Sequence, residues 1–123
     1  MNFKPEHFAV WTEIPVADMA RAITFYSSVF QTVLQTDDSG PNPIALFPTA
    51  TQGGVAGHLY PGKPAVDGSG PTVHLACPDT LEATLTRVGE AGGQVLTEVI
   101  AIPAGRFAYC LDTEGNSIGV FSR

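Results

Sequence analysis

Three side chains in the first half of the chain are the main candidates for chemistry. His58 lies in the apolar run 55–60, and an imidazole takes up and releases protons near neutral pH, which suits acid-base catalysis. Glu13 is a candidate base. It lies two residues after Trp11 in the run 8–14, so both side chains point to the same side of a strand. The indole of Trp11 suits stacking on an aromatic ligand. Each residue also has a structural interpretation: a hydrogen-bonded histidine, a core tryptophan and a solvated carboxylate at a strand end.

The size and charge of the chain restrict its class. It has 123 residues, 44% of them hydrophobic, which is enough for one globular domain with a core. Its net charge of −6 argues against nucleic acid and anionic membranes as partners. We find no apolar run of about 18 residues and no signal peptide. Cys77 and Cys110 lie in strand-like runs, and we expect free thiols in a reducing cytoplasm.

The first half of the chain has the pattern of a strand, a helix and three further strands. The run 8–14 is rich in β-branched and aromatic residues, which predicts a strand. From Asp18 the apolar period changes to that of a helix over residues 18–30, with Asp18 as its N-cap. The apolar face of that helix carries Met19, Ala22, Ile23, Tyr26 and Phe30. The three strands are expected over residues 32–36, 44–47 and 55–60.

The second half repeats this order after a linker rich in proline and glycine over residues 61–71. A strand is expected over residues 72–77, followed by a helix that begins at Asp79 or Thr80 and ends at Gly92. Asp79 and Glu82 have the spacing of a capping box. Three more strands are expected over residues 94–102, 106–111 and 117–122. The repeat predicts one α+β domain over residues 1–123, made of two paired βαβββ modules, about 7–60 and 72–123, around a cleft.

Two motifs, one in each module, carry a family resemblance. The first is Asp18-x-x-Arg-Ala-Ile-x-Phe-Tyr26 in the first helix, and the second is Asp112-x-Glu-Gly-Asn116 in the last hairpin. With Gly53-Gly-Val-x-Gly57 between them, the chain resembles the vicinal oxygen chelate superfamily, which includes glyoxalase I, extradiol dioxygenases and bleomycin resistance proteins. The resemblance spans nearly the whole chain. It implies two βαβββ modules, a U-shaped cleft and often a homodimer, and the linker is long enough for modules to exchange between chains.

Enzymes of that superfamily commonly hold a divalent metal with four side chains on the first, fourth, fifth and eighth strands. The resemblance places those positions at Trp11, His58, Val73 and Gly119, of which only His58 can bind a metal. A slip of one residue in the fifth strand would present His74 in place of Val73. The resemblance therefore implies a cleft without the metal, and we expect no cofactor.

The resemblance also implies which other side chains contact a ligand. Trp11, Tyr60, Val73 and Phe121 are the expected walls of the cleft. Arg106 and Tyr109 either lie at its mouth or only complete the last hairpin.

Three hypotheses for function remain open. The first is a protein that binds a small organic molecule in the cleft without a metal, as resistance proteins sequester drugs, with a neutral or cationic ligand favoured by the negative net charge. The second is a lyase or isomerase in which His58 and Glu13 transfer protons; dioxygenase chemistry is not expected. The third is a non-catalytic interaction module that binds a partner protein.

Overall fold

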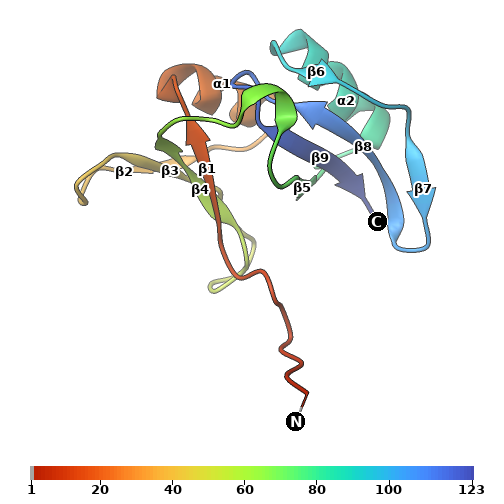
Figure 1. Cartoon of the computed structure of the whole chain (residues 1–123), viewed down its shortest axis with the longest axis horizontal. Helices are drawn as coiled ribbons and strands as arrows, with labels where there is room; N and C mark the ends of the chain where they lie inside the picture. Colours follow the sequence, from red (N-terminus) through yellow and green to blue (C-terminus); the bar gives the residue numbers. More distant parts are fainter. Residues whose placement is uncertain (1) are drawn as a thin grey trace.

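The computed structural model describes residues 2–123, which form two α-helices, one 3₁₀ turn and nine strands (Figure 1). The helices are α1 (Met19–Val29) and α2 (Leu81–Glu90), and the 3₁₀ turn is η1 (Val66–Gly68). The strands are β1 (Thr12–Val16), β2 (Gln35–Asp37), β3 (Ile44–Leu46), β4 (Gly57–Pro61), β5 (Val73–Ala76), β6 (Gln94–Val95), β7 (Ile100–Ile102), β8 (Gly105–Leu111) and β9 (Ser117–Ser122).

The strands form two mixed sheets of matching topology. Sheet A has the order β1-β4-β3-β2, and sheet B has the order β5-β9-β8-β6, with β7 also paired to β8. In each sheet the strand before the helix pairs in parallel with the last strand of its module, β1 with β4 and β5 with β9, and the other pairs are antiparallel. The predicted α+β fold of two βαβββ modules is confirmed. No helix formed by residues 2–123 has the length and apolar character that crossing a membrane requires.

The helix starts partly match the prediction. Asp18 is the N-cap of α1, and its carboxylate accepts a hydrogen bond from the backbone nitrogen of Arg21 at 3.0 Å. For α2, Thr80 is the N-cap, so the capping box of Asp79 and Glu82 is wrong. Both carboxylates bind guanidinium groups instead: Asp79 binds Arg87, and Glu82 binds Arg106. Charge-assisted hydrogen bonds of this kind are stronger than those to neutral backbone groups.

The first strand is displaced from its predicted range. It begins at Thr12 rather than Phe8, because among the described residues no strand pairs with residues 8–11, which belong to an arm that leaves the body (Figure 1). It continues through Pro15, where the sequence suggested its end. Proline is tolerated here because β1 is the edge strand of sheet A.

The predicted strand over residues 94–102 is two short strands, β6 and β7, both paired with β8. Between them the hydroxyl of Thr97 accepts the hydrogen bond of the Tyr109 backbone nitrogen at 3.1 Å. A side-chain hydroxyl thus takes the place of a backbone acceptor at this point, and the regular pairing of the strands is interrupted. The other predicted strands all overlap observed strands.

One hydrophobic core lies between the helices and both sheets. Phe25 and Tyr26 of α1 and Leu81 and Val88 of α2 belong to it. The sheets contribute the side chains that point toward the helices, among them Ile14, Val16 and Leu59 from sheet A and Cys110, Ile118 and Val120 from sheet B. Side chains alternate across a sheet, so the intervening ones point away from this core. We call the two outward sides open face A (Glu13, Leu46, His58, Tyr60) and open face B (His74, Phe107, Tyr109, Phe121).

The β8–β9 hairpin loop joins the second module to the first. The Glu114 carboxylate accepts hydrogen bonds from the backbone nitrogens of Ala17 and Asp18, each at 3.0 Å, and from the Arg21 guanidinium at 2.8 and 3.0 Å. The guanidinium is the main reason that the pKa of Glu114 is lowered to about 2. Asn116 donates to the Pro15 carbonyl at 2.8 Å. The two motifs of the resemblance therefore bind each other, and they hold β1 in place relative to sheet B.

Candidate functional site

Three of the predicted site residues meet beside open face A. Glu13 on β1 lies directly opposite His58 on β4, and Trp11 immediately precedes β1. The indole Nε1–H of Trp11 donates a hydrogen bond to Nδ1 of His58 at 3.0 Å. On the other side of the imidazole, Nε2 lies 3.6 Å from Oε1 of Glu13. The His58 side chain is 13% exposed and that of Glu13 is 65% exposed, so the carboxylate faces solvent over a largely covered ring.

The Trp11 hydrogen bond determines the tautomer of His58. An indole nitrogen only donates, so Nδ1 of His58 must be the acceptor and carries no proton. The neutral imidazole therefore has its proton on Nε2, which points toward Glu13. The side chain thus presents an N–H donor beside a carboxylate acceptor at the surface of open face A.

A hollow of about 430 Å³ adjoins this pair. Tyr60 lines it, with its ring centroid 6.2 Å from that of His58, and Asp37 lines it from β2. Hydrogen bonds from Ser39 lower the pKa of the Asp37 carboxyl, so this carboxylate is ionised at neutral pH. No lysine or arginine of the described chain is among its lining residues, which are Glu13, Asp37, Ser39, Gly40, Pro41, Asn42, Ile44, His58 and Tyr60. The hollow is therefore negatively charged.

Open face B carries a cluster of aromatic rings instead. The His74 ring packs edge-on against Phe107 and Phe121, with centroids 5.0 and 5.7 Å apart, and lies 5.8 Å from Tyr109. His74 pairs with Gly119 across the β5–β9 ladder, and its ring lies where a side chain at position 119 would begin. Gly119 therefore leaves the space that the imidazole fills.

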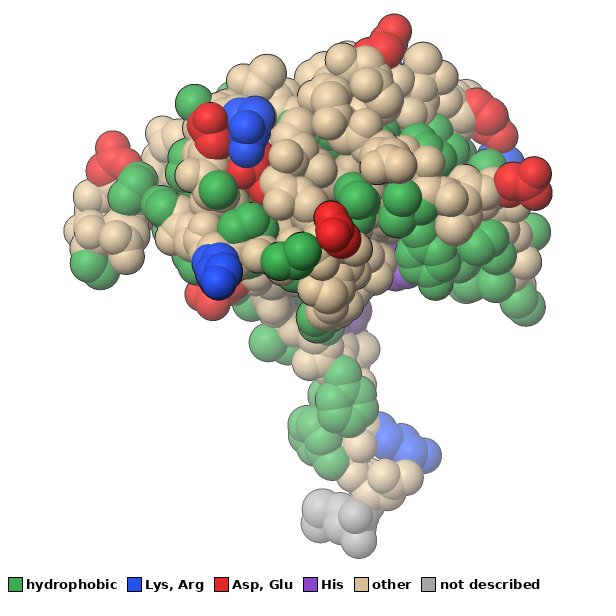
Figure 2. Space-filling view, turned by 45° about the horizontal axis from the view of Figure 1, so that its top comes forward, with side chains coloured by type: hydrophobic (Ala, Val, Ile, Leu, Met, Phe, Trp, Pro, Cys, Tyr) green, Lys and Arg blue, Asp and Glu red, His purple; other side chains and the backbone are tan. Residues whose placement is uncertain are grey.

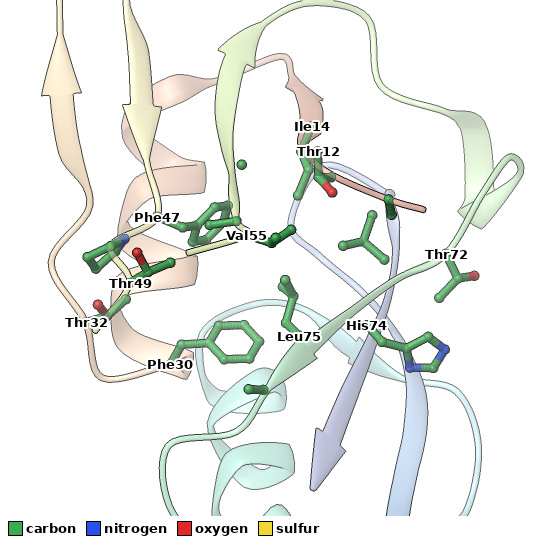
Figure 3. A pocket seen from close by; sticks show the side chains of 16 residues that line it. Thr12, Ile14, Phe30, Thr32, Phe47, Thr49, Val55, Thr72, His74 and Leu75 are labelled. Carbon is green, nitrogen blue, oxygen red and sulfur yellow. The ribbon is translucent and has the colours of Figure 1, made fainter. Parts of the chain in front are cut away.

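A larger cavity lies elsewhere, between the two modules (Figure 3). Its volume is about 650 Å³, and its lining comes from β1, the end of α1, the segment between β3 and β4, and β5. Apolar walls include Ile14, Phe30, Phe47, Val55 and Leu75. Figure 3 shows the His74 ring at its edge, turned away from the centre. His58 and Glu13 are not among its lining residues, so the candidate acid-base pair and this cavity are separate.

The remaining predicted residues are distributed over three places. Tyr109 and Phe121 lie on open face B, and Val73 lines the cavity between the modules. The fifth strand thus takes the register that turns His74, not Val73, to the side of Gly119. Arg106 points to the helix side of sheet B, where it binds Glu82 of α2 at 2.9 Å. It lies on neither open face.

Phe107 and Asp37 were not among the residues predicted for the site. Phe107 occupies the same apolar alternation along β8 as Tyr109, which was a usable signal. Asp37 lies in a run of turn residues and gave none, because its place beside His58 depends on sheet pairing.

The four positions that correspond to metal ligands do not form a donor set for a divalent metal. The Trp11 indole only donates, Gly119 has no side chain, and Nδ1 of His58 already accepts from Trp11. On the fifth strand the register presents His74 in place of Val73, and the His74 ring packs against Phe107 and Phe121. Nowhere in residues 2–123 do three or more His, Cys, Asp or Glu side chains gather in a way that could hold a metal ion. A catalytic zinc site generally uses three protein ligands and a water.

A family model and a curated relative match the chain along most of its length. The model described as the Glyoxalase/Bleomycin resistance protein/Dioxygenase superfamily matches residues 5–120. A glyoxylase-like domain-containing protein from Didymella fabae is 31% identical over 119 residues, which cover 90% of each chain.

Solved structures share the fold at low sequence identity. A glyoxalase/bleomycin resistance protein from Albidiferax ferrireducens matches with a TM-score of 0.70 and 19% identity, over 92% of this chain and 97% of that chain. Fosfomycin resistance protein FosX from Mesorhizobium loti matches with a TM-score of 0.65 and 16% identity, over 98% of this chain and 94% of that chain. Glyoxalase I from Zea mays matches with a TM-score of 0.66 and 21% identity, over 92% of this chain and 45% of that chain.

Proposed function

The chain belongs to the glyoxalase/bleomycin resistance protein/dioxygenase superfamily, and on that premise we propose that it binds a small organic molecule on open face A without a resident metal ion. The hydrogen bond from Trp11 to His58 is the observation that carries the proposal. It occupies one nitrogen of His58 and directs the other, as an N–H donor, toward the hollow. Trp11 and Tyr60 supply aromatic surface near His58, with ring centroids 5.8 and 6.2 Å from that of the imidazole.

The charge of the hollow supports a neutral or cationic ligand. Glu13 and Asp37 both line it, and no lysine or arginine of residues 2–123 does. An anionic ligand would enter against two carboxylates, whereas an amine or amide would find acceptors there. The His58 Nε2–H would donate to a carbonyl or hydroxyl oxygen of the same molecule.

A homodimer is part of the proposal. Open face B presents Tyr109 and Phe121 beside exposed His74, and aromatic side chains are enriched where proteins pair. A second copy would bring this aromatic face over open face A and complete a cleft. We also propose a cytoplasmic location, which the two unpaired cysteines support.

Fluorescence of Trp11, the only tryptophan, tests the binding proposal. A thermal-shift screen of small molecules supplies candidate ligands, and a genuine one should shift the indole emission on titration. We expect His58→Ala to weaken binding at least tenfold. The matched control is His7→Ala, since His7 is exposed in the arm and pairs with Glu6 rather than with any residue of open face A. Binding that survives both Trp11→Ala and His58→Ala unchanged would show that open face A is not the site.

Elemental analysis tests the metal part separately. After incubation with zinc, nickel, manganese or ferrous iron and dialysis, we expect well below one metal ion per chain, because the donor set is incomplete. One tightly held metal per chain would contradict the proposal.

A second candidate is proton transfer by a lyase or isomerase. The 3.6 Å approach of His58 Nε2 to Glu13 favours it, because an imidazole beside a carboxylate is suited to move a proton. With a ligand from the screen in D₂O, deuterium incorporation that Glu13→Gln abolishes would support catalysis. Binding without exchange would favour sequestration.

A further inference from the structure

The larger cavity, of about 650 Å³, lies where sheets A and B end at β1 and β5, two strands that do not pair with each other. Ile14 of β1 and Leu75 of β5 line it, and Ile14 belongs to the hydrophobic core while Leu75 packs against it. The cavity is therefore on the side of the sheets that the helices cover. His58 and His74, which stand at positions that correspond to metal ligands of the superfamily, belong to open faces A and B on the other side. The surface that carries those positions and this cavity are therefore distinct.

The walls of the cavity are apolar and uncharged. Its lining residues include no aspartate, glutamate, lysine or arginine. Figure 3 shows the side chains of Phe30, Val55 and Leu75 directed into the cavity. Covering such walls with an apolar molecule removes them from water, which is favourable. A charged molecule would instead lose its hydration and find no opposite charge there.

Threonine hydroxyls add polar groups to these apolar walls. Figure 3 shows Thr12 and Thr32 on opposite sides of the cavity, with apolar side chains between them. The Thr49 hydroxyl donates to the Thr51 carbonyl at 2.8 Å, whereas those of Thr12 and Thr32 make no hydrogen bond within residues 2–123. A hydroxyl both donates and accepts, so these two can bind a hydroxyl or a carbonyl group of a ligand.

We propose that this cavity is a second small-molecule site, which takes an uncharged apolar molecule with one or two hydroxyl or carbonyl groups. Its volume lies within the range of roughly 300–1,000 Å³ that is usual for ligand pockets. Strand β1 is the wall between the two sites: Glu13 lines the negatively charged hollow of open face A, and Ile14 lines the uncharged cavity. The two sites therefore select different molecules, and this inference does not depend on the ligand proposed for open face A.

A protein segment is a weaker match for the cavity than a small molecule. Every residue of such a segment other than proline brings a backbone N–H and a C=O group, and these must be hydrogen-bonded when they are buried. The lining side chains offer few partners beyond the threonine hydroxyls. A small molecule with one or two polar atoms needs no more than these.

Two exposed apolar surfaces compete with the cavity for an apolar probe. Hydrophobic side chains gather along the arm before β1 and over sheet B beside β7 and β8 (Figure 2). Phe8 and Val10 are exposed in the arm, and Leu96 and Ile102 are exposed on sheet B. A test of the cavity must therefore show where the probe binds as well as that it binds.

N-phenyl-1-naphthylamine, an uncharged probe that fluoresces more strongly in apolar surroundings, tests the site on the full chain. We expect saturable binding of about one probe per chain. The matched probe is 8-anilino-1-naphthalenesulfonate, which has the same rings and an added sulfonate, and we expect it to bind at least tenfold more weakly. The contrast should persist at high salt, which screens the net charge of −6 but does not restore the lost hydration of the sulfonate. Equal binding of the two probes would contradict an uncharged site.

A charge in the cavity wall should exclude the uncharged probe. We expect Val55→Glu to weaken its binding at least tenfold, because the carboxylate and its water would occupy the apolar space. The matched control is Val33→Glu, since Val33 is 83% exposed and does not line the cavity, and it should leave binding unchanged. Val55 is itself 48% exposed, so both variants should fold, which circular dichroism checks. Equal binding by the two variants would overturn the proposal.

Methyl NMR of the wild type locates the probe. At saturation the methyl signals of Ile14, Val55 and Leu75 should shift, because these side chains line the cavity. Those of Leu96 and Ile102, on the exposed surface of sheet B, should not move. Shifts confined to the arm or to sheet B, or a probe that does not bind saturably, would overturn the cavity site. Neither result bears on open face A, whose own ligand is tested separately.

Discussion

Open face A and open face B each carry one histidine, and the two are held in different ways. His58 on β4 is fixed by polar partners, with the Trp11 indole on one nitrogen and the Glu13 carboxylate near the other. His74 on β5 is fixed by packing, against the rings of Phe107 and Phe121 and over the bare backbone of Gly119. The structure gives its imidazole no hydrogen bond within residues 2–123.

The difference shows how neighbours determine what a histidine can do. A hydrogen-bonded imidazole has a set tautomer and directs its N–H, so His58 is suited to recognition or proton transfer. A ring held by aromatic edges offers surface, and His74 is suited to stacking. The duplicated βαβββ topology therefore carries two surfaces of different chemistry.

A glycine lies beside each of the two histidines, and we expect the largest loss of stability when the one next to His58 is replaced. Gly57 begins β4, and a Cβ there would meet the carbonyl of Thr12 on β1. Because the obstacle is backbone, Gly57→Ala must separate β1 from β4, and we expect a loss of about 3 kcal/mol in the free energy of unfolding. Urea denaturation measures it. A loss below about 1 kcal/mol would show that the β1–β4 pair is more adaptable than its geometry indicates.

The hydrogen bonds that Glu114 accepts from Ala17, Asp18 and Arg21 hold the two open faces in their relative positions. Glu114→Gln removes the charge that binds Arg21 and two backbone nitrogens, and we expect a loss of about 2 kcal/mol at pH 7. The pKa of Glu114 is about 2 in the folded chain and lies near 4.5 when the chain is unfolded. Its contribution is therefore complete above pH 4.5 and is lost as the pH falls toward 2.

The pH dependence separates this effect from general acid unfolding. The difference in stability between the wild type and Glu114→Gln should shrink steadily below pH 4.5. A difference that stays constant between pH 6 and pH 3 would mean that the charge of the Glu114 carboxylate does not stabilise the contact between the modules.

Gly119→Ala is the counterpart on open face B, and its effect should be smaller. Here the new Cβ meets the His74 ring, which is an exposed side chain that can rotate away. We expect a loss of about 1 kcal/mol in the free energy of unfolding. The effects of Gly119→Ala and His74→Ala should not be additive, because Gly119→Ala should cost almost nothing in a His74→Ala background. Equal losses in both backgrounds would place the strain elsewhere than at His74.

Trp11→Phe has the smallest expected effect on stability, within about 0.5 kcal/mol, because the residue is 46% exposed and the ring is replaced by a ring. Its effect on His58 should be specific. Loss of the indole N–H frees Nδ1, so ¹⁵N NMR of the imidazole should change from the single Nε2–H tautomer to a mixture. His7 and His74 provide internal controls whose signals should not move. An unchanged His58 signal would show that another group sets the tautomer.

Much of the architecture was predictable from local pattern. The change of period at Asp18 identified α1 and its N-cap, and the repeat of that order after residue 71 identified two modules. The motifs Asp18–Tyr26 and Asp112–Asn116 pointed to the superfamily. These signals are local because capping, amphipathic period and hairpin turns are settled within a few residues of the chain.

The site depended on contacts between distant strands. Trp11 and His58 are 47 positions apart, and only the β1–β4 register brings the indole to the imidazole. Val73 and His74 were alternatives because one residue of slip exchanges the two faces of a strand, and the β5–β9 pairing settled it in favour of His74 beside Gly119. Arg106 turned to Glu82 because α2 packs on that side of β8. The chain's own sequence determined which elements form and in what order; tertiary pairing alone decided which side chains share a face, since the alternation along a strand has no direction until a neighbouring strand supplies it.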